Sequence, residues 1–243
     1  MANGLFGGGT GASGTPWLVE DAADLNAVRN NLGANYKQVS NIDLSGFAEW
    51  IPIGAIFSGT YNGNSYKVSN VTCTASYTFT GLFAENYGSI INLGVENINY
   101  VTGGSNVGGL VGRNSSGTIS NCYATGDVIG DSYVGGLVGY NSSGTISNCY
   151  ATGNATGSSS VGGLVGRDSS GTISNCYATG DVIGDSYVGG LVGRSTGTIS
   201  NCYALNNYIN RRAGQVTTTF GDITGSGSVT NCYSLDTMQF VQL

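Results

Sequence analysis

The 243-residue chain contains no histidine, and this absence removes several kinds of site at once. Metal centres built on imidazole, Ser-His-Asp triads and Cys-His dyads all need that side chain. Charged residues make up only 9% of the sequence, and proline occurs twice. Because the net charge is −6 and only eight residues are lysine or arginine, we expect no nucleic-acid partner.

Long apolar runs are absent too. No stretch approaches the ~20 consecutive apolar residues that span a bilayer, so we expect no membrane insertion. Residues 1–11 have neither a basic region nor a continuous apolar region, unlike a secretory signal. This beginning of the chain predicts a product made in the cytoplasm.

What the sequence does contain is a 27-residue repeat. The hexapeptide V-G-G-L-V-G begins at Val107, Val134, Val161 and Val188. A period of this length indicates one small structural unit stacked on copies of itself. Glycine is the commonest residue, with 42 copies, but a 40% hydrophobic content in regular register argues against a disordered chain.

Each repeat predicts three short strands, which in the first copy cover residues 107–112, 118–125 and 127–129. Glycine, asparagine and serine turns separate them. With a bend near Asn121, the side chains of Ile119, Cys122 and Ala124 face inward. The pattern predicts an all-β fold: a single-stranded right-handed parallel β-helix (β-solenoid) of about 27 residues per coil. Looser copies extend it to roughly seven coils.

Four segments follow from this repeat. We predict a flexible Gly-rich N-terminal arm over residues 1–14 and an N-terminal cap over 15–35. Within this cap, Leu25, Val28 and Leu32 are spaced as in a short amphipathic capping helix over 20–32. The β-solenoid covers 36–204, and a divergent last coil with a C-terminal cap covers 205–243.

Six cysteines recur along the chain, and the last five lie in the tripeptide Asn-Cys-Tyr. Neighbours in register would have Cβ atoms nearly 5 Å apart, beyond the ~3.8 Å of a disulfide. We therefore predict a ladder of buried, reduced thiols. No CxxC pair is present, which disfavours zinc, and we predict no metal site and no cofactor. The cysteines are Cys73, Cys122, Cys149, Cys176, Cys202 and Cys232.

The hexapeptide and the following G-T-I-S-N-C-Y-A-T-G resemble the GLUG motif of bacterial surface adhesins and of bacteriophage and prophage proteins. With its lead-in, the resemblance covers residues 15–233. It implies a β-solenoid scaffold but leaves the function open, because such scaffolds are attached to very different proteins.

Our main functional hypothesis is a bacteriophage virion component, such as a tail fibre or a capsid decoration protein, that assembles in the host cytoplasm. A virion protein needs no export signal. The N-terminal arm and caps would contact other virion proteins, and a homo-oligomer is left open. The alternative is a bacterial adhesin located outside the cell, on the cell surface.

Two outward ladders form the predicted binding surface for host cell-surface glycans. Stacked aromatic rings flanked by hydroxyl groups suit sugars, which have apolar faces and polar edges. The alternative is that the tyrosines only stabilise the stack. The residues are Tyr123, Tyr150, Tyr177, Tyr203, Tyr233, Thr118, Thr145, Thr172 and Thr198.

We predict no enzyme activity and no catalytic residues. The aspartates Asp127, Asp131, Asp181 and Asp185 lie at Gly-flanked turns, where turn chemistry explains them. A carbohydrate-active β-helix enzyme and an ice-binding protein are third-ranked alternatives. Threonine arrays on solenoids suit ice, but bulky tyrosines and variable positions argue against a flat surface. Those positions are Arg113, Tyr140, Arg167 and Arg194.

Overall fold

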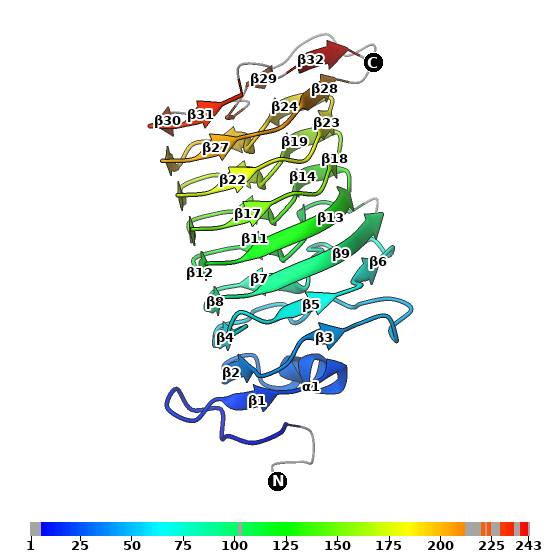
Figure 1. The fold of residues 1–243 in the computed structure, drawn as a ribbon, viewed down its shortest axis with the longest axis vertical. Coiled ribbons are helices and arrows are strands. Elements are labelled where there is room, and N and C mark those ends of the chain that lie inside the picture. The colour runs from blue at the N-terminus through cyan, green and yellow to red at the C-terminus, as the bar shows by residue number, and fades with distance from the viewer. Residues whose placement is uncertain are drawn as a thin grey trace.

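The structure is a computed structural model that describes residues 6–101, 104–211, 220–221, 223–224, 229–235 and 239–242. It is a β-solenoid of about seven turns with about 27 residues per turn. Figure 1 shows the coils stacked along one long axis, with the two ends of the chain at opposite ends of the rod. The fold class predicted from the repeat is therefore confirmed.

One face of the rod is a nine-stranded parallel sheet, which we call the threonine sheet. In-register pairing stacks each Thr-Ile-Ser segment on the next one. Its strands are β1 (Trp17–Val19), β2 (Asn35–Gln38), β4 (Thr60–Asn62), β8 (Ser89–Ile91), β12 (Thr118–Ser120), β16 (Thr145–Ser147), β21 (Thr172–Ser174), β26 (Thr198–Ser200) and β30 (Val229–Thr230).

A second face is a thirteen-stranded sheet, the tyrosine sheet, in which the long strands β9 (Gly94–Val101) and β13 (Tyr123–Ile129) join two columns of shorter strands. The shorter strands are β3 (Ile42–Asp43), β5 (Lys67–Ser69), β6 (Thr72–Cys73), β17 (Tyr150–Ala151), β18 (Ala155–Thr156), β22 (Tyr177–Ala178), β23 (Val182–Gly184), β27 (Tyr203–Ala204), β28 (Tyr208–Arg211), β31 (Tyr233–Ser234) and β32 (Gln239–Gln242).

Two five-stranded sheets complete the coil, and both carry the glycines of the hexapeptide. The first glycine sheet contains β10 (Val107–Gly108), β14 (Ser132–Gly135), β19 (Ser159–Gly162), β24 (Ser186–Gly189) and β29 (Phe220–Gly221). The second glycine sheet contains β7 (Phe83–Asn86), β11 (Val111–Asn114), β15 (Val138–Asn141), β20 (Val165–Asp168) and β25 (Val192–Ser195).

The three strands predicted per repeat are thus divided differently. The run 107–112 is broken at Gly109 and Leu110, where the chain passes from one glycine sheet to the other. The run 118–125 is broken at Asn121, which has a φ of 53°. Asparagine tolerates this left-handed conformation, so it makes the predicted bend between the threonine and tyrosine sheets.

The core consists of identical side chains stacked on one another. Every leucine and isoleucine of the two predicted inward ladders is fully buried, which confirms the inward assignment. The first coils hold larger side chains, including Trp50, Tyr61 and Phe83, and the regular coils hold smaller ones. The two ladders are Leu110, Leu137, Leu164 and Leu191, and Ile119, Ile146, Ile173 and Ile199.

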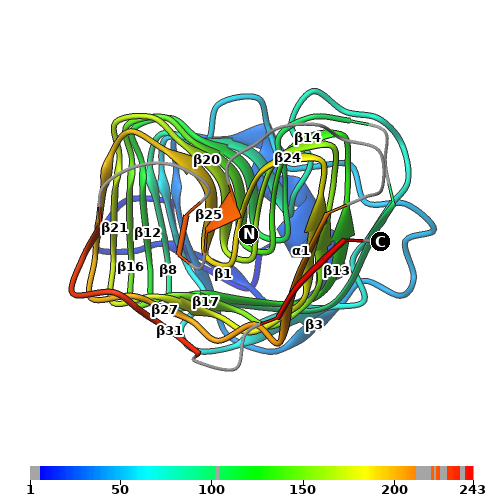
Figure 2. The same ribbon diagram turned by 90° about the horizontal axis from the view of Figure 1, so that it is seen from above.

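Glycines allow the two glycine sheets to touch. A Cβ atom on Gly135 would lie 2.6 Å from the backbone nitrogen of Gly166 in the next coil, and one on Gly162 would lie 2.6 Å from that of Gly193. Strands β14 and β20 pack against each other. In Figure 2 both glycine sheets lie near the middle of the outline, so each coil folds inward on itself.

Inside the coil, a second set of glycines faces the tyrosine sheet. A Cβ atom on Gly163 would lie 2.3 Å from the carbonyl oxygen of Gly190 and 2.8 Å from the Cβ atom of Ala178. Both distances are far below van der Waals contact. The alanines of the tyrosine sheet, Ala124, Ala151 and Ala178, lie opposite Gly109, Gly136 and Gly163, so the repeat keeps small residues on both sides of this contact.

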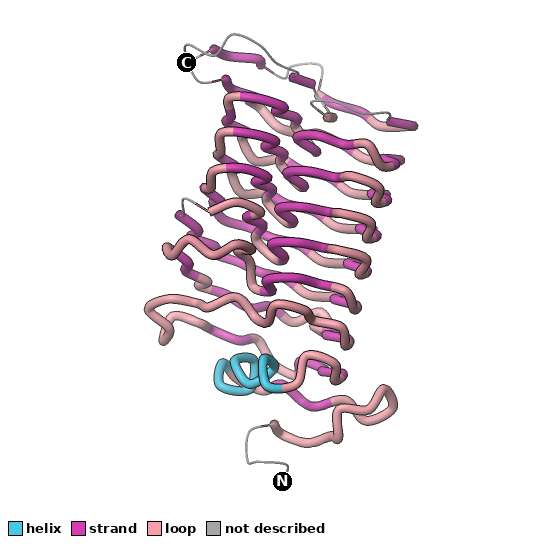
Figure 3. The backbone as a smooth tube through the Cα atoms, turned by 180° about the vertical axis from the view of Figure 1, so that it is seen from behind, coloured by secondary structure: helices cyan, strands magenta, loops and turns pink. Residues whose placement is uncertain are grey.

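The N-terminal helix is present but shorter than predicted. Helix α1 spans Ala22–Ala27, and the 3-10 turn η1 (Val28–Asn30) follows it. The Asp21 side chain caps the helix by accepting from the backbone N–H groups of Ala23 and Asp24 at 2.9 Å each. Figure 3 places the helix at the N-terminal end of the stack, where Leu25 is fully buried.

The structure describes residues 6–14 of the predicted N-terminal arm. These residues fold back on β1: Gly7 donates to Leu18 O at 3.1 Å, and Leu18 donates to Gly8 O at 2.9 Å. The Phe6 ring stacks on Trp17 with 5.3 Å between centroids. Backbone pairing and aromatic contact thus hold this segment, while residues 1–5 lie outside the described residues.

Strand pairing is present before residue 36 and also after residue 204, in the region of the predicted divergent last coil. It begins at β1, which pairs with β2. It continues after residue 204, since β30, β31 and β32 pair with strands of the preceding coil. Parts of the predicted C-terminal cap, residues 212–219, 225–228 and 236–238 among them, lie outside the described residues.

The glycine contacts give the first prediction. Gly163→Ala should lower the free energy of unfolding by about 1–3 kcal/mol, because its methyl group would overlap the Gly190 carbonyl oxygen. Gly46→Ala is the matched control, since a Cβ atom there meets nothing within 4 Å. Urea denaturation followed by circular dichroism measures both, and equal stabilities of the two variants would contradict the packing argument.

Candidate functional site

The predicted binding ladders lie on two different faces. Thr118, Thr145, Thr172 and Thr198 are all exposed on the threonine sheet. The tyrosines stand on the tyrosine sheet, on the other side of the bend at Asn121. The two ladders therefore meet at an edge of the rod and do not form one flat surface.

The tyrosine rings stack on one another. The rings of Tyr123 and Tyr150 are 4.9 Å apart and 2° from parallel, and those of Tyr150 and Tyr177 are 4.8 Å and 6°. Near the end of the rod, Tyr203 and Tyr233 stack at 5.6 Å. Ring faces inside such a stack are occupied by neighbouring rings, so ring edges and hydroxyl groups are what they present to solvent.

The Tyr123 ring has two further contacts that fix its place. Its hydroxyl donates to Glu96 Oε1 at 2.7 Å, and Glu96 also accepts from Lys67 at 2.7 Å. A Cβ atom on Gly94 would overlap the ring, so glycine makes room for it in the coil before. These contacts favour the stabilising role of the stack. Its part in ligand binding stays a prediction.

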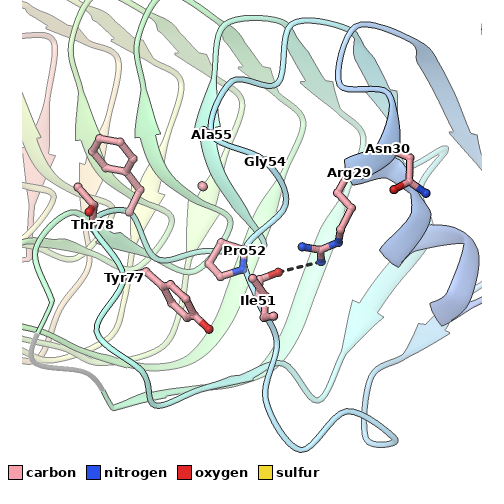
Figure 4. Close-up of a pocket in the computed structure, with 10 residues that line it drawn as sticks. Arg29, Asn30, Ile51, Pro52, Gly54, Ala55, Tyr77 and Thr78 are labelled. Carbon is pink, nitrogen blue, oxygen red and sulfur yellow. Dashed lines mark hydrogen bonds between the residues drawn. The ribbon is translucent and has the colours of Figure 1, made fainter.

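A cleft of about 700 Å³ lies near the N-terminal end of the rod (Figure 4). Arg29 forms part of its wall: Nη2 donates to Ile51 O at 3.0 Å, and the guanidinium lies 5.4 Å from the centre of the Trp50 ring. Pro52 and Phe79 add apolar surface. The lining comes from residues 29–30, 51–52, 54–55, 77–79 and 84, all outside the regular repeats, which is why the repeat did not reveal it.

The cysteine ladder is shorter than predicted. Backbone N–H groups of Cys122, Cys149 and Cys176 each donate to the sulfur of the next cysteine along the stack at 3.4 Å. Cys73 lies elsewhere, on β6 opposite Tyr100, and Leu93 occupies the ladder position below Cys122. All six are free thiols, but Cys232 is only half-buried, in contrast to the prediction of six buried thiols.

A second polar ladder was not anticipated from the sequence. The Asn86 side chain donates to Asn114 at 2.9 Å, Asn114 donates to Asn141 at 2.9 Å, and Asn141 donates to Asp168 at 2.8 Å. Ser195 donates to the other oxygen of Asp168 at 2.8 Å. All five residues are buried within the second glycine sheet or at its edge. In the sequence, the available signal was a polar residue at the position after V-G-x in each of the four regular repeats.

Asp168 is a further acid of the repeats, in addition to the four aspartates that the sequence predicts at turns. It is 1% exposed, and burial raises the pKa of its carboxyl above the ordinary value, although hydrogen bonds from Ser195, Asn141 and Gly171 act in the opposite direction. Its immediate partners are an amide, a hydroxyl and backbone groups. They give it no second carboxyl with which to share a proton in acid-base catalysis.

Within the part of the chain that the structure describes, no group of three His, Cys, Asp or Glu side chains could hold a metal ion. The described helices include none long and apolar enough to cross a membrane.

Burial raises the pKa of Cys73 to about 12, with the charge of Glu49 adding to the shift. A thiol with so high a pKa is a poor nucleophile at neutral pH.

Comparison with known proteins finds a known repeat motif. The GLUG motif matches residues 103–129, 130–156, 157–183 and 184–207, the four regular coils. The chain therefore contains four GLUG repeats and folds as a β-solenoid, in agreement with the resemblance noted in its sequence.

Two curated proteins are similar to part of the chain. Halomucin of Haloquadratum walsbyi is 35% identical over 139 residues, which cover 49% of this chain and 2% of halomucin. A protein named "Putative Gly-rich membrane protein" of Evansella cellulosilytica is 35% identical over 184 residues, covering 46% of this chain and 21% of its own length. The chain thus spans a small part of both relatives.

A solved structure shares the whole fold. The crystal structure titled "putative immunoglobulin A1 protease" from Bacteroides ovatus superposes with a TM-score of 0.85 and 26% sequence identity. The match covers 99% of this chain and 81% of the other one.

The cysteine geometry predicts a specific reactivity pattern. In the native protein, a thiol reagent at pH 8 should modify Cys232 alone, because it is the one thiol that is not fully buried. After denaturation without reductant, all six thiols should react. Cys232→Ser should abolish the native reaction and leave five thiols in denaturant. Fewer than six free thiols in the denatured parent would contradict the ladder of reduced thiols.

The buried carboxyl of Asp168 predicts that the Asp168→Asn variant is more stable than the parent by an amount that depends on pH. Because the native pKa is raised, folding penalises ionised Asp168, and stability falls as pH rises through the range between the unfolded and native pKa values. Asparagine removes this penalty and continues the amide ladder. At pH 7 the variant should be more stable by on the order of 1 kcal/mol, and the gain should shrink below about pH 4.

Asp127→Asn is the control for that comparison. It removes the same charge from an exposed position that lies within strand β13 and not in the predicted turn, where the side chain accepts from Asn154 N at 3.1 Å and an amide oxygen can do the same. Its melting temperature should stay within about one degree of the parent at both pH values, as for most surface changes. A lower stability of Asp168→Asn at pH 7 would show that the ladder needs the carboxylate.

Proposed function

We propose that this chain is a non-enzymatic adhesive module displayed at a cell surface. The observation that carries the proposal is the pattern of similarity. The chain matches a short part of two much longer proteins, one named as a mucin and one named as a membrane protein. Long surface proteins commonly contain stable repeat units that extend and present a binding face, and a β-solenoid suits that task.

The surface chemistry supports the same role. With 9% charged residues, the rod presents mainly hydroxyl, amide and aromatic groups, including the exposed threonine ladder. Such groups bind sugars through hydrogen bonds and apolar contact without needing a deep pocket. Cell-surface glycans remain the proposed ligands, bound along the faces of the rod.

The fold neighbour named as an immunoglobulin A1 protease raises the question of enzyme activity. This chain has no histidine for a serine or cysteine protease. Its described carboxyl groups form no cluster of three, and burial keeps the Cys149 thiol protonated by raising its pKa. We infer that the shared solenoid serves as a scaffold in both proteins and that this chain does not cleave its ligand.

The role as a bacteriophage virion component stays a prediction. The relatives described above carry names of surface or membrane proteins, which favour the cell-surface alternative. Tail or capsid genes beside the gene for this chain would support a virion role. An export or anchoring system beside it would support the adhesin.

Ice binding is a second candidate with one specific observation in its favour. The tyrosines that argued against a flat threonine surface lie beyond the bend at Asn121, so the Thr-Ile-Ser array of β12, β16, β21 and β26 is unobstructed by them. The array covers four coils. The similarity to surface proteins gives the adhesive role the stronger support.

A cell-binding assay tests the adhesive function. The labelled full chain should bind a glycan-rich cell surface saturably at micromolar concentration or below, and periodate oxidation of the glycans should reduce binding at least tenfold. Immunoglobulin A1 and the bound polysaccharide should stay intact in the same incubation. Binding that is insensitive to periodate would contradict glycan recognition, and cleavage of either substrate would overturn the non-enzymatic assignment.

A further inference from the structure

A row of partly exposed arginine and tyrosine side chains runs across successive strands of the two glycine sheets. We call it the guanidinium stripe. It contains Arg113, Tyr133, Tyr140, Arg167, Tyr187 and Arg194. Pairing places Arg113, Tyr140, Arg167 and Arg194 in register on β11, β15, β20 and β25. These side chains lie on successive coils, about 4.8 Å apart at the backbone.

Each guanidinium of the stripe lies against an aromatic ring. Arg113 is 5.3 Å from the centre of the Tyr140 ring, Arg167 is 5.3 Å from that of Tyr133, and Arg194 is 4.8 Å from that of Tyr187. Arg167 also donates to the Tyr133 hydroxyl at 3.0 Å. Contact with a ring helps to position a guanidinium, and the N–H groups that the ring leaves free can bind a planar anion.

The backbone is strained to hold two of these rings. Tyr133 has a φ of 55° and Tyr187 a φ of 51°, a left-handed conformation that is unfavourable for a bulky residue. The corresponding residue of the coil between them, Ser160, has the same conformation with a small side chain. The fold therefore tolerates other residues there, and the tyrosines are not needed for the turn itself.

The charges of the stripe are unevenly matched. Arg113 pairs with Glu85 at 3.6 Å, whereas Arg167 and Arg194 form no ion pair with any carboxyl among the described residues. The two unpaired guanidinium groups belong to adjacent coils. Arg167 and Arg194 are partners in the register of β20 and β25, and an anion bound beside both would offset the repulsion between their like charges.

Neighbouring groups define the local field. Asp131 and Asp185 lie two residues before Tyr133 and Tyr187, directly ahead of β14 and β24. Within the stripe, burial acts to raise the pKa of Tyr140, but hydrogen bonding with Ser169 and Ser142 and the charges of Arg167 and Arg113 outweigh this, so the pKa is lowered. An anionic group is therefore favoured at the stripe of a protein that is acidic overall.

We propose that the guanidinium stripe binds a linear polysaccharide that carries carboxylate groups, a polyuronate, with its chain parallel to the solenoid axis. This assignment rests on the proposed adhesive function for its biological setting. A carboxylate accepts two parallel N–H bonds from one guanidinium, and the tyrosine edges contact the sugar rings. Arg167 and Arg194, in register on adjacent coils, match successive carboxylates of a ligand whose charges recur at regular intervals.

Binding of polygalacturonate, measured by isothermal titration calorimetry on the full chain, tests the proposal. The double variant Arg167→Gln, Arg194→Gln should weaken binding at least tenfold. The double variant Lys37→Gln, Lys67→Gln removes the same charge from other faces of the rod and should change binding less than twofold. The variant with lysine at both arginine positions keeps the charge but loses the planar fork, and should weaken binding several-fold.

A ligand-side control does not depend on how the variants fold. Polygalacturonate whose carboxyl groups have been reduced to alcohols should not bind the parent protein. Three results would each overturn the proposal. The first is that the parent protein does not bind polygalacturonate. The second is that the Arg167→Gln, Arg194→Gln variant and the Lys37→Gln, Lys67→Gln variant lose the same amount of binding. The third is that the Arg167→Lys, Arg194→Lys variant binds as tightly as the parent.

Cell binding separates this proposal from the adhesive function. A parent protein that binds polygalacturonate through the stripe but binds no cell surface would leave the site standing and refute adhesion. A protein that binds cells equally well with and without Arg167 and Arg194, and shows no affinity for polygalacturonate, would refute the site and leave adhesion standing.

Discussion

The structure depends on backbone contact between glycines of neighbouring coils. Gly135 against Gly166 and Gly162 against Gly193 bring the two glycine sheets so close that no side chain fits between them. The coil consequently folds inward instead of enclosing a wide core, and side chains as small as alanine and valine fill the remaining interior. Backbone hydrogen bonds along the four sheets then hold the coils in register.

That inward fold also determines what the surface presents. The edges of the glycine sheets bring two outward rows of side chains together, and the guanidinium stripe forms where arginines of one row meet tyrosines of the other. The threonine and tyrosine sheets lie around the outside of the coil. The rod therefore has faces of different chemistry, and each face repeats its chemistry along the long axis.

Much of the fold was predictable because the repeat reports directly on register. The leucine and isoleucine ladders and the bend at Asn121 followed from a fixed spacing and from residue type. The break at Gly109 and Leu110 did not, because a glycine pair in a sequence does not tell whether it ends a strand or allows close packing. The predicted helix over 20–32 is divided into α1 and the 3-10 turn η1, and the helical conformation ends at Asn31.

The candidate sites were less predictable, since they depend on which side chains meet across sheets. The tyrosine ladder was visible in the sequence. Only the structure shows that neighbouring rings cover each other's faces, since the Tyr150 and Tyr177 ring centres are 4.8 Å apart. The contact between Arg167 and Tyr133 joins residues 34 positions apart, on different coils. Asp168 resembled one more turn residue until its burial between Asn141 and Ser195 became visible.

The amide ladder has a direction along the rod. From Asn86 to Asn141 each side chain donates toward the C-terminus, and Ser195 donates toward the N-terminus, so the two directions meet at Asp168. A duplicated coil with asparagine at this position would fit before Asp168 by donating toward it, and after Asp168 by donating back to its carboxylate and accepting from Ser195. Because an ionised carboxylate only accepts, Asp168 is the residue at which both directions of this ladder can end, however many whole coils are added on either side of it.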